Sequence, residues 1–292
     1  MALYRALSKA TDIPSDAVVF VNTLLPFAAM LWGRRTGRRV IVHVHEVSIT
    51  PGPLRRFLTS CAGRSADLLL YVSNDHRARL PIEGPPALIV PNPVGAALVA
   101  RADGHAPRQD RQQFRILMLA SLRGYKGINE FMVLAEELQK RTDISFDLVL
   151  NAEADDAAAF ARRHSDAANV SIHPRTDDPA KFYSDADLVL NLSRVDEWIE
   201  TFGLTLIEAM TFGLPVIAPP VGGPVEIVTH GIDGYCIDSR NSEALREAVL
   251  KLADDPETYD AMALSARKRA QDFSFEAYAA TLRAALNTLG EK

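Results

Sequence analysis

Residues 196–228 read DEWIETFGLTLIEAMTFGLPVIAPPVGGPVEIV, and this stretch decides the fold. A short apolar run over 188–190 precedes it and predicts a strand. The polar loop that follows leads through Gly203 into an amphipathic helix over 204–212, and Gly213 ends that helix just before another apolar run. Continuous apolar strands joined by a helix are typical of parallel strands that are buried on both faces.

The same alternation of strand and helix continues along the rest of the chain. Strands are predicted over 17–21, 40–44, 68–72, 87–90, 115–119, 146–150, 170–173, 188–190, 215–218 and 234–237. Helical patterns lie between them, as over 128–139, where apolar residues recur at helical spacing. This order predicts right-handed βαβ units and an α/β fold with two Rossmann-like, doubly wound domains.

One segment interrupts the alternation. Residues 95–113 are polar, punctuated by glycine and proline and without a sustained period, which predicts an interdomain linker. The linker separates a first domain over 1–94 from a second over 114–272, and 273–292 is expected to be a final helix. The first domain opens on a helical pattern over 1–10 instead of a strand with a glycine turn. We therefore expect it to be truncated.

Composition and charge exclude several classes of protein. Hydrophobic residues make up 48% and charged residues 24% of the 292, which excludes a disordered or fibrous chain. The formal net charge of −5 argues against a general nucleic-acid binder. Cys61 and Cys236 are too few and too far apart for a disulfide scaffold or a zinc site. With no secretory signal in view, we expect a cytoplasmic protein.

The charge is unevenly distributed. Residues 1–64 hold nine Lys and Arg side chains and three Asp and Glu side chains, although the whole chain is acidic. A basic region on an acidic protein is typical of contact with an anionic partner, and it predicts peripheral binding at the inner face of a membrane. A basic face that is simply solvated is the alternative.

The loop and helix around Gly203 have the form of an anion site. Ligands of open α/β sheets bind at the carboxyl ends of the strands, and a helix N-terminus there favours a diphosphate. Glu200 lies just before the helix and Glu208 lies inside it. Because a carboxylate repels phosphate, both side chains should accept hydrogen bonds from neutral hydroxyls, of which sugars carry many. Gly222 and Gly223 would let the backbone approach a ligand closely.

Four pieces of this stretch form a specific pattern. They are the pair Glu200 and Glu208, the triplet EAM from Glu208, the hexamer GLPVIA from Gly213 and the pentamer GGPVE from Gly222. In this order they resemble the donor-site signature of the retaining GT-B glycosyltransferases of family 4, the group 1 glycosyl transferases. The resemblance implies a GT-B architecture. It also implies that Glu200 is a catalytic residue that accepts hydrogen bonds from hydroxyls of the transferred sugar, and that Glu208 accepts them from ribose hydroxyls.

Residues 121–127, SLRGYKG, resemble the family's diphosphate-binding loop. Lys126 matches the family lysine, the family arginine falls on Ser121, and Arg123 stands two residues further on. Backbone amides around the two glycine turns would bind the same diphosphate. The resemblance thus implies a donor-binding set of Glu208, Lys126, Arg123, Ser121, Phe202, Gly203, Leu204, Gly222 and Gly223.

The acceptor side is expected in the first domain. The family often has a histidine at a strand end, which His45 matches as a second catalytic candidate. His43 shares its strand face, because positions two apart on a strand point the same way. Asn22, His43 and Glu46 complete the acceptor-side candidates. In the family the last helix crosses back to the first domain, and two or three strands precede the point at which this chain starts.

The resemblance implies transfer of a sugar from a nucleotide-diphospho-sugar to a saccharide or lipid-linked acceptor hydroxyl with retention of configuration, in cell-surface polysaccharide or glycolipid synthesis. We expect no cofactor, no metal ion and no nucleic-acid partner. Two alternatives stay open: a nucleotide-sugar-binding fragment without activity, and a sugar-nucleotide epimerase of GT-B architecture.

Overall fold

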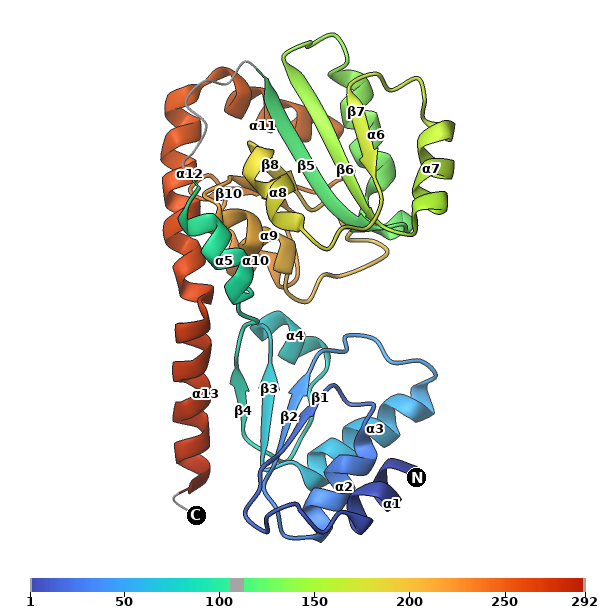
Figure 1. Cartoon of the computed structure of the whole chain (residues 1–292), viewed down its shortest axis with the longest axis vertical. Coiled ribbons are helices and arrows are strands. Elements are labelled where there is room, and N and C mark those ends of the chain that lie inside the picture. Colours follow the sequence, from blue (N-terminus) through green and yellow to red (C-terminus); the bar gives the residue numbers. More distant parts are fainter. Residues whose placement is uncertain (1, 106–112, 291–292) are drawn as a thin grey trace. The chain divides into compact units, whose positions relative to one another are not determined.

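A computed structural model describes residues 2–105 and 113–290, and Figure 1 shows its helices and strands. The chain divides into two compact units. Unit 1 consists of Met1–Asn92 together with Tyr278–Lys292, and unit 2 consists of Pro93–Ala277. Each unit contains one parallel β-sheet, and each is described by itself below.

Unit 1 is built on a four-stranded parallel sheet in the order β1-β2-β3-β4. Its strands are β1 (Val19–Asn22), β2 (Val40–Val44), β3 (Leu68–Tyr71) and β4 (Ala87–Ile89). Its helices are α1 (Ala2–Lys9), α2 (Phe27–Arg35), α3 (Gly52–Ser65), α4 (Asn74–Arg79) and the greater part of α13 (Phe275–Gly290). A helix therefore follows each of the first three strands, as the alternating sequence predicts.

Strand β2 shows why the strands of unit 1 are mainly apolar. All five of its residues are buried. Val40, Val42 and Val44 belong to a core shared with residues of α2 and α3. Ile41 points to the other face, where Ala285 of α13 completes a second apolar cluster. The sheet is thus covered on both sides, which a continuous apolar run requires.

Unit 2 is built on a six-stranded parallel sheet in the order β10-β9-β8-β5-β6-β7. Its strands are β5 (Phe114–Ser121), β6 (Ile144–Asn151), β7 (Val170–His173), β8 (Leu188–Leu190), β9 (Val216–Ala218) and β10 (Gly234–Cys236). Its helices are α5 (Ala96–Asp103), α6 (Ile128–Glu137), α7 (Ala154–Arg163), α8 (Pro179–Asp185), α9 (Leu204–Thr211), α10 (Pro224–Ile227), α11 (Ser242–Asp254) and α12 (Pro256–Ala270). Two short 3₁₀ helices, η1 (Gly124–Lys126) and η2 (Gln271–Phe273), complete it.

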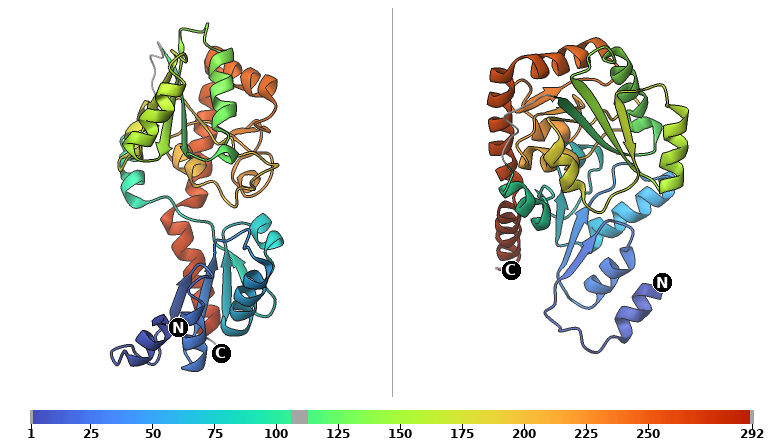
Figure 2. Two further views of the ribbon diagram at one scale, coloured as in Figure 1. Left: turned by 90° about the vertical axis from the view of Figure 1, so that its right-hand side faces the viewer. Right: turned by 45° about the horizontal axis from the view of Figure 1, so that its top comes forward.

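This strand order is that of a Rossmann fold, and it creates a switch point between β5 and β8. From β5 the chain proceeds to β6 and β7 on one side, then returns to β8 and continues to β9 and β10 on the other. Helices α6 and α11 pack side by side on one face of the sheet, and α8 and α9 lie on the opposite face (Figures 1 and 2). The connections that follow β5 and β8 therefore lead to opposite faces of the sheet, which leaves a crevice at the carboxyl ends of these two strands.

The predicted fold class is confirmed: both sheets are parallel, with helices between the strands. The structure differs from the expectation of a linker over 95–113. Helix α5 occupies part of this segment and packs against α8 and α9 within unit 2. Its sequence AALVARAD contains mostly good helix formers, and Ala102 is buried. Residues 106–112 of the expected linker lie outside the described residues.

In the part of the chain that the structure describes, no helix has both the length and the apolar character that crossing a membrane requires.

Candidate functional site

A cavity of about 460 Å³ opens in unit 2 at the switch point. Its polar lining comes from the carboxyl ends of three neighbouring strands: Ser121 ends β5, Asn151 ends β6, and Asn191 follows β8 directly. Lys126 and Glu200 line the cavity from the two loops that follow β5 and β8, and Arg175 and Thr176 line it from the loop that follows β7. The cavity thus lies where ligands of open α/β sheets bind.

Lys126 and Glu200 form an ion pair inside this cavity. The Nζ atom of Lys126 lies 2.6 Å from Oε2 of Glu200, and the two side chains are 23% and 18% exposed. The hydroxyl of Ser193 donates a second hydrogen bond to the same carboxylate oxygen at 3.2 Å. The predicted cation and carboxylate are therefore neighbours, and each neutralises the other.

Helix α9 begins at the edge of the cavity. Gly203 is its N-cap and has a φ of 113°, a conformation that favours glycine over other residues. Gly203, Leu204 and Thr205 all line the cavity. The first amides of a helix lack partners within it and carry a partial positive charge, so this edge of the cavity suits an anionic group.

Gly222 and Gly223 allow close packing between two segments of the chain's own backbone, and their approach to a ligand stays a prediction. A Cβ atom added to Gly222 would collide with the carbonyl oxygen of Glu200, and one added to Gly223 would collide with that of Thr201. The amide of Gly223 also donates a hydrogen bond of 2.9 Å to the Glu200 carbonyl. The glycine pair therefore allows two segments of the chain's own backbone to touch, and so positions Glu200.

Glu208 lies within α9 and contacts a tyrosine that the sequence analysis did not single out. The hydroxyl of the fully buried Tyr183, on α8, donates a hydrogen bond of 2.7 Å to Oε2 of Glu208. Burial raises the pKa of the Glu208 carboxyl, although the Tyr183 hydrogen bond opposes the shift. The same burial, followed by the nearby Glu208 charge, raises the pKa of Tyr183 well above its usual value.

The structure does not gather every expected donor residue around the cavity. Ser121, Lys126, Glu200, Gly203 and Leu204 line it, and its lining does not include Arg123, Phe202, Glu208, Gly222 and Gly223. The side chain of Arg123 is exposed, at the N-cap of η1. Phe202 is buried and packs edge-on against Phe273, with 5.8 Å between ring centroids.

The acceptor-side candidates lie together in unit 1, at the carboxyl ends of β1 and β2. The rings of His43 and His45 are 4.2 Å apart between centroids, as expected for two residues on one strand face. Nε2 of His45 donates a hydrogen bond of 2.7 Å to Oδ1 of Asn22. Burial lowers the pKa of His43 to about 4 and also lowers that of His45, so both rings are neutral near pH 7.

Glu46 and His76 hold this cluster in place. The Glu46 carboxylate accepts hydrogen bonds from the backbone amides of Leu24 at 2.8 Å and His45 at 3.2 Å. The carbonyl of Glu46 accepts a hydrogen bond of 2.6 Å from Nε2 of His76, which is completely buried and whose pKa is lowered mainly by burial. The carboxylate of Glu46 thus joins the two loops that follow β1 and β2.

Sequence reasoning missed several residues of both sites. His76 and Tyr183 lie inside helices, where no motif marks them. Asn191 and Ser193 had a usable signal, because they directly follow a predicted strand end. Among residues 2–105 and 113–290, no group of three or more His, Cys, Asp or Glu side chains is arranged to hold a metal ion.

Comparison with known proteins assigns the family. The model of the family described as glycosyl transferases group 1 matches residues 103–269, which is more than half of the chain. The chain belongs to this family. All the residues that line the cavity of this group 1 glycosyl transferase lie within the matched segment.

Curated relatives of this group 1 glycosyl transferase match over part of their length. Sucrose synthase isoform 1 of Daucus carota is 40% identical over 88 residues, which are 28% of this chain and 11% of that protein. The D-inositol 3-phosphate glycosyltransferase of Paenarthrobacter aurescens is 30% identical over 175 residues, 57% of this chain and 42% of that protein. The chain thus matches less than half the length of either relative.

Solved structures show the same fold. The Anabaena protein Alr3699/HepE, solved in complex with UDP and glucose, superimposes with a TM-score of 0.77 at 18% sequence identity. The superposition covers 98% of this chain and 80% of that one. The fold of this group 1 glycosyl transferase is therefore the GT-B fold that the sequence predicts.

Proposed function

We propose that this chain transfers a sugar from a nucleotide-diphospho-sugar to an acceptor hydroxyl with retention of the anomeric configuration. The observation that carries the proposal is the Lys126–Glu200 pair inside a cavity at the switch point of the unit 2 sheet. Family membership and the UDP and glucose bound to the Anabaena protein of the same fold support it.

The pair suits a donor because its two members can exchange partners. When a diphosphate enters, Lys126 would turn from the Glu200 carboxylate to the phosphate oxygens, where a charge-assisted contact is strong. Glu200 would then accept hydrogen bonds from hydroxyls of the transferred sugar. The first amides of α9, beside Gly203, would bind the same diphosphate.

The transfer step breaks the bond between the anomeric carbon and the diphosphate oxygen, and the acceptor oxygen bonds to that carbon from the same face. The acceptor proton passes to the departing diphosphate. Lys126 and the α9 amides would stabilise the charge that develops on the leaving group. We assign Glu208 to ribose hydroxyls, and His45 of unit 1 to the acceptor side. The acceptor we propose is a saccharide or glycolipid of the cell surface.

The test combines binding and product analysis. Wild-type protein is screened by thermal shift against UDP-, GDP-, ADP- and dTDP-sugars, and the best donor is incubated with candidate acceptors. Glu200→Gln should abolish transfer while nucleotide still binds. Lys126→Ala should weaken donor binding about 10- to 150-fold, the equivalent of roughly 1.5–3 kcal/mol for a charge-assisted contact. Exposed Lys181→Ala, on α8 outside the cavity lining, is the matched control.

Each alternative gives a different result. Donor binding without any product would indicate a binding fragment, and a changed sugar released without acceptor would indicate an epimerase. If Glu200→Gln turned over the donor as fast as the wild type, Glu200 would take no part in transfer and the proposal would be refuted.

We also propose that unit 1 contacts an anionic membrane surface. The first two turns of α3 expose Leu54 and Phe57, at 37% and 45%, beside the exposed Arg55 and Arg56. Apolar side chains flanked by arginines are typical of helices that lie in a membrane interface. Sedimentation with phosphatidylglycerol vesicles should therefore be salt-sensitive and weakened by Arg55→Gln with Arg56→Gln. Vesicle binding that changes neither with salt concentration nor with these substitutions would refute the proposed membrane contact.

A further inference from the structure

The loop between β8 and α9, residues 191–203, carries Glu200 but contains no helix or strand. Its position must therefore come from contacts with neighbouring segments. At its far end the Glu200 carbonyl accepts a hydrogen bond from the Gly223 amide, and near its start the Ser193 amide donates one to Oδ1 of Asn191. The stretch between these two points is held mainly through Arg194.

The backbone of Arg194 attaches the loop to the neighbouring one. Its amide donates a hydrogen bond of 2.9 Å to the carbonyl of Tyr125, in the loop that carries Lys126. Its carbonyl accepts the amide of Trp198 at 2.8 Å. The ring of Trp198 in turn stacks on that of Tyr125, with 5.0 Å between centroids and 22° between planes. Lys126 Nζ lies 5.7 Å from the centre of the Trp198 ring.

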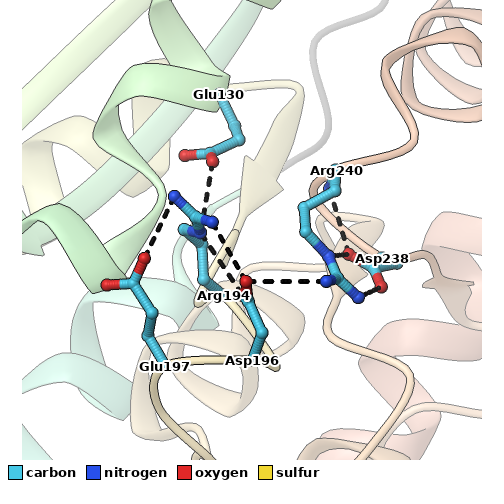
Figure 3. A network of polar contacts seen from close by, with 6 residues as sticks. All are labelled: Glu130, Arg194, Asp196, Glu197, Asp238 and Arg240. Carbon is cyan, nitrogen blue, oxygen red and sulfur yellow. Dashed lines mark hydrogen bonds and ion pairs between the residues drawn. The ribbon is translucent and has the colours of Figure 1, made fainter.

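The side chain of Arg194 is the centre of a network of ion pairs (Figure 3). Its guanidinium lies 3.0 Å from a carboxylate oxygen of Asp196, 3.1 Å from one of Glu197 and 3.6 Å from one of Glu130, on the first turn of α6. Asp196 also lies 3.5 Å from Arg240, the partner of Asp238 at 2.6 Å. One arginine thus joins the loop to α6 and, through Asp196, to the segment before α11.

Charge makes this network sensitive to the loss of Arg194. Four carboxylates and two guanidinium groups form it, and removing Arg194 leaves Glu130 and Glu197 without their cation, while Asp196 and Asp238 keep Arg240. Glu130 is the least exposed of the four, at 16%, and its buried Oε2 has no hydrogen-bond partner among the described residues. Asp196 and Glu197 of the loop would then repel Glu130 of α6, which weakens the contact between the loop and that helix.

We propose that Arg194 is a positioning residue that holds the 191–203 loop against the Lys126 loop and so fixes Glu200 beside Lys126. Arg194 does not line the cavity, so it acts through the loop and not on the ligand. The inference rests on the proposed function, because its effect on binding is measured with a nucleotide-sugar. Its effect on the loop can be measured without any ligand.

Trp198 supplies the ligand-free measurement. The chain has two tryptophans, and the other, Trp32, is buried in unit 1. In a Trp32→Phe background, Trp198 is the only tryptophan, so acrylamide quenching reports the accessibility of the loop. Arg194→Gln should at least double the quenching constant at 20 °C, while circular dichroism stays unchanged. Arg162→Gln, at an exposed arginine of α7 with no ion pair among the described residues, is the control with the same charge change.

The functional measurement uses UDP-glucose, UDP and the three related sugar nucleotides of the thermal-shift panel. Arg194→Gln should weaken the affinity for the donor that the wild type binds about 10- to 100-fold, because a displaced loop loses the charge-assisted contact of Glu200 with the donor, which is of about this size. Arg194→Lys should fall between, because an ammonium keeps the charge but not the planar fork. Adding Glu130→Gln to Arg194→Gln should recover part of the affinity by removing the repulsion.

The outcomes separate the two ideas. If the wild type binds no nucleotide-sugar, the proposed function fails, and the quenching experiment still decides whether Arg194 orders the loop. Equal quenching in the wild type and Arg194→Gln would overturn the inference. So would greater quenching with unchanged donor affinity, or a double variant that binds no better than Arg194→Gln alone.

Discussion

Acidification should destabilise unit 1 through His43. The ring is 4% exposed on β2, and its pKa is lowered to about 4. Burial is the main cause, followed by the charges that His45 and His76 would carry, and a hydrogen bond with the backbone of Val90 opposes them. The folded unit therefore takes up this proton at a lower pH than the unfolded chain does.

The sign and size follow from this difference. An unfolded histidine binds its proton near pH 6.5, so the unfolded state is favoured as the pH falls below that value, and the effect is complete near pH 4. A pKa difference of about 2.5 at about 1.36 kcal/mol for each unit gives a loss of about 3.4 kcal/mol in the free energy of unfolding. This part of the stability is fully present above about pH 6.5.

Urea unfolding of unit 1 at pH 7 and at pH 4.5, followed by NMR signals of its core, measures the greater part of this loss. His43→Phe keeps a ring of similar shape and removes the titrating group, so the variant should lose less stability on acidification than the wild type. Histidine NMR titration gives the pKa directly. Equal losses in the two proteins, or a His43 signal that titrates near pH 6.5, would refute the reasoning.

Three further predictions concern unit 2. Tyr183→Phe removes the hydroxyl that donates a hydrogen bond to Glu208, and it should lower the free energy of unfolding by about 1.5–3 kcal/mol in urea titrations. An unchanged free energy of unfolding would count against this contact. Gly223→Ala should destabilise by about 1–3 kcal/mol because its Cβ meets the Thr201 carbonyl, whereas Gly95→Ala has open space and should be neutral. Transfer activity should survive dialysis against EDTA, and loss restored by Mg²⁺ would show that a metal takes part.

Much of the fold could be read from the sequence because buried parallel strands have a simple signature. The run over 40–44 is apolar except for His43 because helices cover both faces of β2, and the structure has a strand there. Glycines were informative where conformation requires them, as at Gly203 with its φ of 113°. Helix α5 was missed because eight residues are too few for a helical period to stand out from a polar segment.

The candidate site was predicted less completely, because its contacts join residues that lie far apart in the sequence. Lys126 and Glu200 were found separately, each by a local motif, but their contact at 2.6 Å joins loops 74 positions apart. The Tyr183–Glu208 hydrogen bond depends on how α8 packs against α9, which no local pattern encodes. Gly222 and Gly223 were recognised as necessary glycines, yet the segment they approach could be identified only in three dimensions.

The packing of α13 on the unit 1 sheet affects how the protein is made. Ile41 and its neighbours on that face need Ala285, yet all of unit 2 is translated between Asn92 and Tyr278. At about 5–20 residues per second, a ribosome takes roughly 10–40 s to synthesise that interval. During this time one apolar face of the unit 1 sheet stays exposed to solvent on the nascent chain. Such a face is the kind of surface that chaperones acting on nascent chains bind.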